Sequence, residues 1–208
     1  MSEESICIIV LAAGASSRMG EPKQLLKFEG ETLLRRAARA ALETRSHPVV
    51  VVLGYRAHVM REEIVDLNAL MVVNQEWPEG MSSSIRCGLR RALESTAPAE
   101  IEAAILMLCD QPYVTSRAIE RLIDAYRESR APVVASEYGA GGGKTLGVPA
   151  LFSRALFPEL MALHGAQGAK RLIAQHRAEA AVVAMLEAAF DVDTPGDYRA
   201  LSDKESFD

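Results

Sequence analysis

Short apolar runs alternate with helical patterns along the chain. Runs in which almost every residue is apolar, such as 103–108, predict strands buried on both faces of a sheet. Between the runs, apolar residues recur at helical spacing, as Leu33, Leu34 and Ala37 do within 32–43. This alternation is typical of βαβ units and a mostly parallel sheet. The predicted strands are 6–12, 48–53, 69–73, 103–108 and 132–136, and the predicted helices are 32–43, 57–66, 83–94 and 116–130.

The alternation changes after residue 136. The glycine-rich segment 138–144 predicts a surface loop or hairpin tip near the functional site, and it is a candidate lid. The remaining predicted elements are an apolar segment at 147–152, helices over 153–163 and 166–176, a strand over 180–186 and a short helix over 197–201. Without an internal repeat or a long linker, we expect residues 1–208 to form a single α/β domain. Its expected fold is Rossmann-like, a mostly parallel sheet flanked by helices on both faces.

Composition and charge exclude several function classes. Hydrophobic residues make up 49% of the 208 residues and charged residues 25%, which is ordinary for a soluble globular protein. The net charge of −5 argues against non-specific nucleic-acid binding, which needs a basic surface. An anionic ligand must therefore be met by local cations.

The cysteines and the N-terminus indicate a cytoplasmic protein. Cys7, Cys87 and Cys109 are odd in number and lack motif spacing, which excludes a disulfide scaffold and a CxxC zinc site. The acidic start MSEESIC has no basic region of the kind that begins a secretory signal. No apolar run approaches the length needed to cross a membrane, so we expect no membrane partner.

A loop rich in small residues follows the first predicted strand, in the stretch IIVLAAGASSRMGEPKQLL at 8–26. Small residues let backbone N–H groups surround an anion, and Arg18 and Lys23 add counter-charge. The spacing of Gly14 and Gly20 fits neither the Walker A pattern nor the dinucleotide fingerprint. The alternative is an ordinary glycine-containing turn, but the two cations favour a triphosphate site.

Two acidic segments, at 110 and at 191–197, are candidates for holding a metal ion. Asp110 follows the strand 103–108 at its carboxyl end, where parallel sheets bind ligands. Asp191 and Asp193 lie on one side of a short extended segment. Carboxylates of this kind suit Mg²⁺, which also takes phosphate oxygens as ligands. The alternatives are a turn or helix-cap aspartate at 110 and a capping cluster for the last helix at 191–197.

A third polar segment, 74–84, leads from a predicted strand into a helix. Its three serines at 82–84 and the helix N-terminus suit an anionic or polar ligand. We expect Trp77 to pack against the strand rather than to stack on a base. The four histidines lack metal-ligand spacing, and no G-x-S-x-G elbow is present, so the sequence predicts no protein nucleophile.

The pattern LAAGxSxRMGxxK resembles the signature of the MobA-like nucleotidyltransferases, particularly the molybdenum cofactor cytidylyltransferases. The resemblance implies that the loop wraps the triphosphate of an incoming nucleotide. Relatives that transfer guanylyl groups usually read LAGG, so Ala13 favours CTP over GTP. The implied nucleotide-binding residues are Leu11, Ala12, Ala13, Gly14, Ala15, Ser16, Arg18, Lys23, Gly80, Met81 and Ser84.

Further elements that resemble this family imply metal-binding and catalytic residues. The CDQP element at Asp110 and the DVDTPGD element at Asp193 imply two Mg²⁺ ligands, although Gly196 replaces the family's usual acidic residue. The implied catalytic residues are Arg18, Lys23 and Asp110.

The acceptor side resembles the family less closely. Gly147 and Pro149 match its GxPxLF segment, and Lys170 stands where its GDxGAR segment has Arg, which implies contact of these residues with the acceptor. Val148 stands where the family often has His, and Ala166 stands where it has an acid.

The resemblance implies transfer of CMP from CTP to the terminal phosphate of molybdopterin, with release of pyrophosphate. The N-terminal half of the chain would bind the nucleotide and the C-terminal half the acceptor, with a molybdoenzyme as a further partner. The alternatives are transfer of GMP to molybdopterin, transfer to another phosphorylated acceptor such as a sugar phosphate, and a non-catalytic nucleotide-binding chaperone of the cofactor. Two metal-binding carboxylates favour catalysis over the chaperone.

Overall fold

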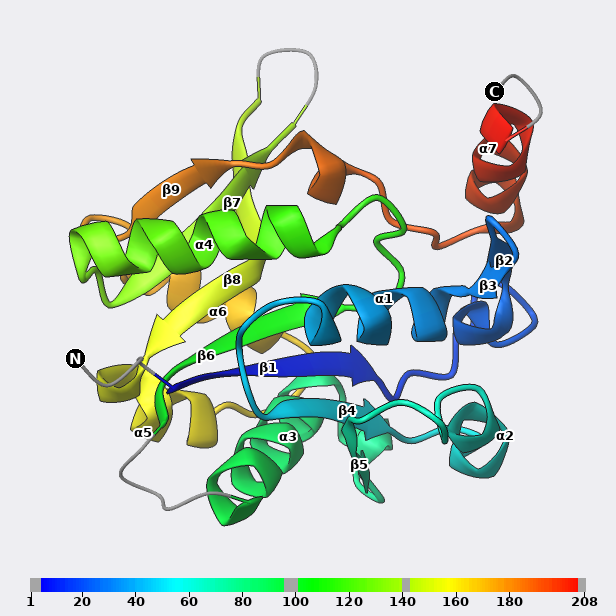
Figure 1. The fold of residues 1–208 in the computed structure, drawn as a ribbon, viewed down its shortest axis with the longest axis horizontal. Coiled ribbons are helices and arrows are strands. Elements are labelled where there is room, and N and C mark those ends of the chain that lie inside the picture. The colour runs from blue at the N-terminus through cyan, green and yellow to red at the C-terminus, as the bar shows by residue number, and fades with distance from the viewer. Residues whose placement is uncertain (1–4, 96–100, 140–142, 206–208) are drawn as a thin grey trace.

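A seven-stranded mixed sheet forms the centre of the protein, seen in a computed structural model that describes residues 5–95, 101–139 and 143–205 (Figure 1). The strand order is β5-β4-β1-β6-β8-β7-β9. β8 runs antiparallel to both neighbours, and the other pairs are parallel, so the predicted mostly parallel α/β sheet is confirmed. The strands are β1 (Ser5–Ala12), β4 (Val49–Leu53), β5 (Leu70–Val73), β6 (Ile101–Leu108), β7 (Val133–Tyr138), β8 (Thr145–Ser153) and β9 (Ala181–Ala184).

Helices cover both faces of this sheet. Alternate residues of β1 separate into two cores, with Ile8 and Val10 on one face and Ile9 and Leu11 on the other. Helices α1, α2 and α4 pack on the first core, and α3, α5 and α6 pack on the second; Figure 1 shows α1 and α4 in front of the strands. The helices are α1 (Leu33–Leu42), α2 (Ala57–Glu62), α3 (Met81–Ser95), α4 (Ser116–Ser129), α5 (Phe157–Met161), α6 (Gly168–Gln175) and α7 (Pro195–Glu205).

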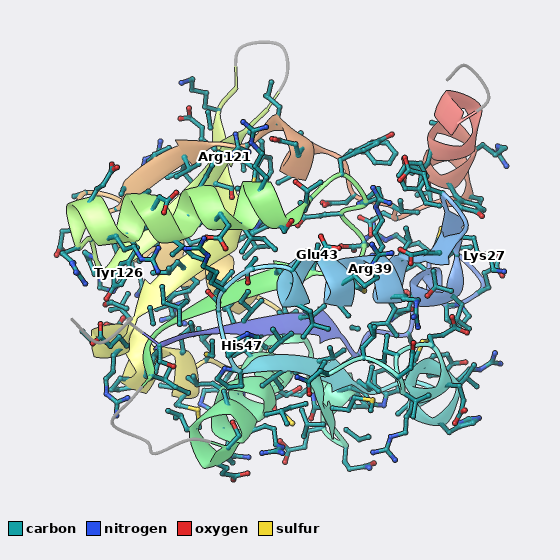
Figure 2. The ribbon with its side chains drawn as sticks, viewed as in Figure 1. Lys27, Arg39, Glu43, His47, Arg121 and Tyr126 are labelled. Carbon is teal, nitrogen blue, oxygen red and sulfur yellow. The ribbon has the colours of Figure 1, made fainter. Side chains whose placement is uncertain are left out.

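Local side chains begin the two long helices of the first face. Thr32 accepts a hydrogen bond from the Arg35 amide at the start of α1, and Thr115 accepts one from Ala118 at the start of α4. Figure 2 labels Arg39 and Glu43, which form an ion pair on the solvent side of α1 at 3.2 Å. The apolar stripe of α1 therefore packs on the sheet while its charged side faces water.

The segment after β7 differs from the prediction. β8 extends to Ser153, and a 3-10 turn at Arg154–Leu156 separates it from α5, so the predicted helix over 153–163 is wrong in its first part. β7 and β8 pair up to Tyr138 and Thr145, which makes the intervening segment a hairpin tip as predicted. Residues 140–142 of that tip lie outside the described residues, as does most of the acidic start MSEESIC.

A small two-stranded hairpin, β2 (Lys27–Phe28) with β3 (Glu31–Thr32), was not predicted because two-residue strands carry no readable periodicity. It lies beside α7 in Figure 1, and Tyr198 Oη donates to the Lys27 carbonyl at 3.0 Å. Phe28 and Met19 share a separate apolar cluster with Val192 and Leu201. The glycine-containing loop and the C-terminal segment are thus held together by their own core.

The cysteines are free thiols, as predicted. Burial raises the pKa of Cys7 and of Cys109 to about 12, which keeps both in the unreactive thiol form at neutral pH. None of the described helices has the length and hydropathy needed to cross a membrane.

We expect Gly88→Ala to destabilise the protein by about 1–3 kcal/mol, because α3 packs on the sheet with no room for a methyl group. A Cβ at Gly88 would lie 2.5 Å from Ile9 Cγ2 and 2.8 Å from Val52 Cγ2, both on stiff β-branched side chains. Gly196→Ala in α7 is the matched control, since its Cβ would meet only Thr194 Oγ1 at 3.5 Å. Chemical denaturation of both variants checks this, and equal free energies of unfolding would contradict the close packing.

Candidate active site

The loop after β1 is organised around Gln24, a buried side chain that no sequence pattern singles out. Gln24 is 1% exposed, and its Nε2 donates to the carbonyls of Ala12 at 3.0 Å and Gly14 at 2.7 Å. Ser16 has φ +55° and donates to Gln24 Oε1, while its hydroxyl accepts from the Lys23 amide. A buried amide that satisfies loop carbonyls fixes the loop in one shape.

Four charged side chains meet where this loop passes the carboxyl end of β6. Lys23 Nζ donates to Asp110 Oδ2 and, at 2.8 Å, to Asp193 Oδ1. Arg18 Nη2 donates to Asp193 Oδ2 at 2.9 Å. The three catalytic candidates and the second metal candidate, Asp193, therefore form one contiguous cluster, although they lie up to 175 residues apart in the sequence.

The charges in this cluster depend on one another. Partial burial disfavours the charged form of Lys23, but Asp110 and Asp193 outweigh it and raise the pKa of the ammonium. Desolvation likewise opposes ionisation of Asp193, yet Lys23 and Arg18 hold the pKa of its carboxyl below the usual value. At neutral pH the Lys23 ammonium and the Asp193 carboxylate are therefore both charged.

Asp193 reaches the cluster because its segment pairs with the end of β6. The Val192 amide donates to the Asp110 carbonyl at 2.9 Å. The helix-capping role falls to neighbouring residues, since Asp197 Oδ2 accepts from the Thr194 amide and hydroxyl, each at 2.8 Å. Asp193 is thereby left to pair with Lys23 and Arg18, and the capping role expected of this acidic cluster is filled by Thr194 and Asp197.

The carboxylate pair fits a divalent cation that also binds substrate. Asp110 is 7% exposed, and its buried Oδ1 has no hydrogen-bond partner, so one oxygen remains available as a ligand. No group of three or more Asp, Glu, His or Cys side chains converges as a metal cage within the described ranges. Two protein carboxylates, completed by phosphate oxygens and water, are the donor set that Mg²⁺ takes at nucleotide sites.

A first cleft of about 660 Å³ opens between the loop and the start of α3. Asn74, 3% exposed, shapes its far side by donating to the hydroxyls of Ser83 and Ser84 at 2.8 and 3.0 Å. Trp77 lines the cleft and also packs edge-on against Tyr55. The predicted residues among its lining are Leu11, Ala12, Ala13, Gly14, Lys23, Gly80, Met81, Ser84 and Asp110. Ala15, Ser16 and Arg18 lie outside this lining, and Arg18 lines the next cleft.

A second cleft, about 880 Å³, lies on the other side of the charged cluster. It shares Lys23, Met81, Leu108 and Asp110 with the first. Asp193, Lys170 and Asp191 also line it, the last of these from the acidic segment noted in the sequence. Gln111, Tyr138 and Gln167 line it as well and were not predicted as binding residues. Those positions lack a local pattern and reach the site only through the fold.

Gly147 and Pro149 do not line the second cleft, although Val148 between them does. Gly147 lies against Tyr138, and a Cβ there would clash with Tyr138 Oη. The Pro149 carbonyl accepts a hydrogen bond from Ser136. These two residues thus support the wall that Val148 and Tyr138 present to the cleft.

Asp191 adds a third carboxyl to the second cleft. The pKa of Asp191 is raised to about 6, mainly because surrounding protein atoms partly desolvate its carboxyl and secondly because of the negative charge of Asp110. The residue nevertheless remains exposed to solvent. Gln111, 4% exposed, donates to the carbonyls of Val148 and Ala188 and so holds the wall beside Asp191.

Known proteins with related sequences carry different functional names. The chain is 36% identical to nicotine blue oxidoreductase of Paenarthrobacter nicotinovorans over 59% of its length and 57% of that protein. It is 30% identical to the purine catabolism protein PucB of Bacillus subtilis, over 91% of this chain and 92% of PucB. Molybdenum cofactor cytidylyltransferase of Escherichia coli is 30% identical over 41% of this chain and 44% of that enzyme.

Solved structures and a family model agree on the fold. The Rv0371c homolog from Mycobacterium sp. strain JC1 superposes with a TM-score of 0.80 at 33% identity, covering 98% of both chains. Rv0371c of Mycobacterium tuberculosis in complex with manganese superposes with a TM-score of 0.75 at 30% identity, covering 95% of this chain and 97% of that one. The model of the MobA-like NTP transferase domain matches residues 8–181. Because the family model covers most of the chain, and the fold places a cleft beside paired carboxylates, the chain belongs to the MobA-like NTP transferase family.

Proposed function

We propose that this member of the family transfers CMP from CTP to the terminal phosphate of molybdopterin and releases pyrophosphate. The observation that carries the proposal is the pair of clefts that meet at Lys23 and Asp110. A transferase needs two substrates side by side with their reacting atoms at one charged centre. The first cleft, walled by residues of the N-terminal half, takes the nucleotide. The second, walled largely by residues of the C-terminal half, takes the acceptor within the same single domain.

Ala13 supports CTP as the nucleotide. It is buried, lines the first cleft, and its carbonyl accepts from the Tyr55 amide at 3.0 Å. A Cβ on the neighbouring Gly54 would lie 2.8 Å from Ala13 Cβ, so the methyl group of Ala13 has no room to withdraw. The methyl group takes up space that a glycine would leave free, which favours the smaller pyrimidine base over a purine.

The lining of the second cleft supports a phosphorylated, partly flat acceptor. Lys170 supplies a cation for the acceptor's phosphate, and Tyr138, Val148 and Leu108 supply an aromatic and apolar wall. Molybdopterin combines a terminal phosphate with a heterocyclic ring. Delivery of the product to a molybdoenzyme in the cytoplasm, where the three free thiols stay reduced, completes the proposal.

The proposed chemistry is an in-line phosphoryl transfer. A phosphate oxygen of the acceptor forms a bond to the α-phosphorus of CTP, and the bond from that phosphorus to the bridging oxygen of pyrophosphate breaks. Arg18 and Lys23 hold the β- and γ-phosphates and stabilise the charge that builds up on the leaving group. Asp110 and Asp193 would hold Mg²⁺, which would supply charge neutralisation at the α-phosphate. Catalysis is then positioning and electrostatics, with no protein nucleophile.

Pyrophosphate release tests the proposal directly. The protein is incubated with Mg²⁺, molybdopterin and each of CTP, GTP, ATP and UTP, and pyrophosphate is measured over time. Release that requires CTP, Mg²⁺ and molybdopterin together is expected. Release with GTP in place of CTP would change the assigned reaction to GMP transfer. Release with a sugar phosphate and not with molybdopterin would change the assigned acceptor. Nucleotide binding without release under any combination would favour the non-catalytic chaperone.

We expect Lys23 to compete with a divalent cation for the carboxylate pair. Its ammonium already lies within hydrogen-bond distance of Asp110 and Asp193, and a metal held by both must displace it. Lys23→Ala should therefore raise the affinity for Mn²⁺ alone at least about tenfold, roughly 1.4 kcal/mol, while weakening CTP binding. Electron paramagnetic resonance of free Mn²⁺ measures the first effect and calorimetry the second. Lys27→Ala is the control, and a weaker affinity for Mn²⁺ in Lys23→Ala would contradict the competition.

A further inference from the structure

Two segments from different halves of the chain are joined between the clefts. The nucleotide segment, residues 79–86, contributes Gly80 and Ser84 to the first cleft, and the acceptor segment, residues 163–168, contributes Ala166 to the second. Gly80 has φ +118°, and a Cβ there would lie 2.9 Å from the Gly165 carbonyl oxygen. The two backbones are therefore in direct contact.

Arg86 fastens the two segments together. Its guanidinium binds Glu79 through two nitrogens at 2.9 and 2.6 Å and also donates to the Leu163 carbonyl at 2.5 Å. Glu79 in turn accepts from the Gly165 amide at 3.3 Å, and the Arg86 contact, its largest influence, lowers the pKa of Glu79 to about 2. The Arg86 side chain is 13% exposed and the Glu79 side chain 34%, so the guanidinium is largely covered while the carboxylate still reaches solvent. A planar fork that serves a carboxylate and a carbonyl together cannot be replaced by a lysine.

Met81 extends the link into both clefts. It is the first residue of α3, and it lines both the first and the second cleft. Gly168, at φ +55°, packs so closely on it that a Cβ would lie 2.7 Å from Met81 Sδ. The Ser82 amide adds a hydrogen bond to the Gly165 carbonyl at 3.2 Å. A shift at the start of α3 therefore moves the wall of the acceptor cleft.

We propose that Arg86 is a positioning residue that couples nucleotide binding to the acceptor segment. It touches neither substrate; it acts through Glu79 and the backbone of 163–168. A nucleotide that rests on Gly80, Met81 and Ser84 restricts the motion of the nucleotide segment. Because Arg86 binds both segments, the motion of the acceptor segment is restricted as well. Because such coupling is reciprocal, acceptor binding also strengthens nucleotide binding. This inference rests on the proposed function, since it takes the first cleft as the nucleotide site.

Amide hydrogen exchange with and without CTP and Mg²⁺ tests the coupling. In the unmodified protein, CTP should slow exchange in residues 163–168 at least about fivefold. In Arg86→Gln this protection should disappear while the Kd for CTP changes less than about threefold. Arg86→Lys, which keeps the charge and loses the fork, should behave like Arg86→Gln and replaces it if that variant does not fold. Arg90→Gln, an exposed position on the same helix, is the matched control and should keep the protection.

The outcomes separate this inference from the proposed function. CTP binding without protection of 163–168 in the unmodified protein would overturn the coupling and leave the proposed function standing. Protection that persists in both Arg86 variants would overturn the coupling in the same way. No CTP binding to the unmodified protein would remove the proposed function, and the inference with it.

Discussion

Lys23→Ala is expected to lower kcat/KM for CTP at least a hundredfold, about 2.7 kcal/mol of transition-state stabilisation. Lys23 is the only one of the two loop cations that contacts both carboxylates, and it lines both clefts. Removing it takes away the charge that stabilises departing pyrophosphate. The fold should persist, because Lys23 belongs to a short 3-10 turn after the loop that follows β1, and its side chain is not part of the two main cores.

Lys27→Ala provides the comparison for this variant. Lys27 follows Lys23 by four residues, is exposed on β2 and is labelled in Figure 2. Its substitution removes the same charge from the chain and leaves the cluster in place, so its kcat/KM should stay within about twofold. A loss below about tenfold in Lys23→Ala, less than about 1.4 kcal/mol, is too small for the role assigned to it.

Asp110→Asn is the second variant with a large expected effect, a fall in kcat of about a hundredfold to a thousandfold. The change keeps the shape of the side chain and removes the charge that faces Lys23 and the proposed Mg²⁺. An amide is a weaker ligand for Mg²⁺, so the Mg²⁺ concentration that gives half-maximal rate should also rise. Initial rates of pyrophosphate release across a Mg²⁺ series measure both quantities.

Asp124→Asn controls for the loss of one negative charge. Asp124 is exposed on α4, where it forms an ion pair with Arg127 at 3.7 Å, away from both clefts. Its kcat and Mg²⁺ dependence should match those of the unmodified protein. An Asp110→Asn protein with full kcat at the ordinary Mg²⁺ concentration would contradict the metal role of Asp110.

The parts of the fold that sequence reasoning anticipated are those set by local pattern. β1 and β6 are runs of residues buried on both faces, and α1 and α4 carry regular apolar stripes. Each of these signals lies within about a dozen residues, so it can be recognised without knowledge of the fold.

The parts that it missed depend on which polar groups meet in three dimensions. Gln24 and Gln111 look like ordinary surface amides in the sequence, yet both are buried and hydrogen-bonded to backbone carbonyls. Arg86 resembles any other polar residue on an amphipathic helix, and only the approach of Leu163 gives it a partner across the clefts. Long-range partners of this kind leave no periodic signal.

The pairing of Asp110 with Asp193 lies between these cases. The resemblance to the family placed both carboxylates on one metal, and periodicity alone left a cap role open for each. The structure brings both to the Lys23 ammonium through the backbone bond from Val192 to Asp110. The backbone pairing of Val192 with Asp110 and the attraction of both carboxylates to Lys23 together hold Asp110 and Asp193 at this site.

Calorimetric titration of CTP, GTP, ATP and UTP in the presence of Mg²⁺ tests the central claim most directly, with Lys23→Ala measured alongside. Tight binding of CTP, weaker binding of the other three and loss of CTP binding in the variant are the predicted results. Preference for GTP would contradict the assignment of the base, and the absence of binding by every nucleotide would contradict the triphosphate site itself.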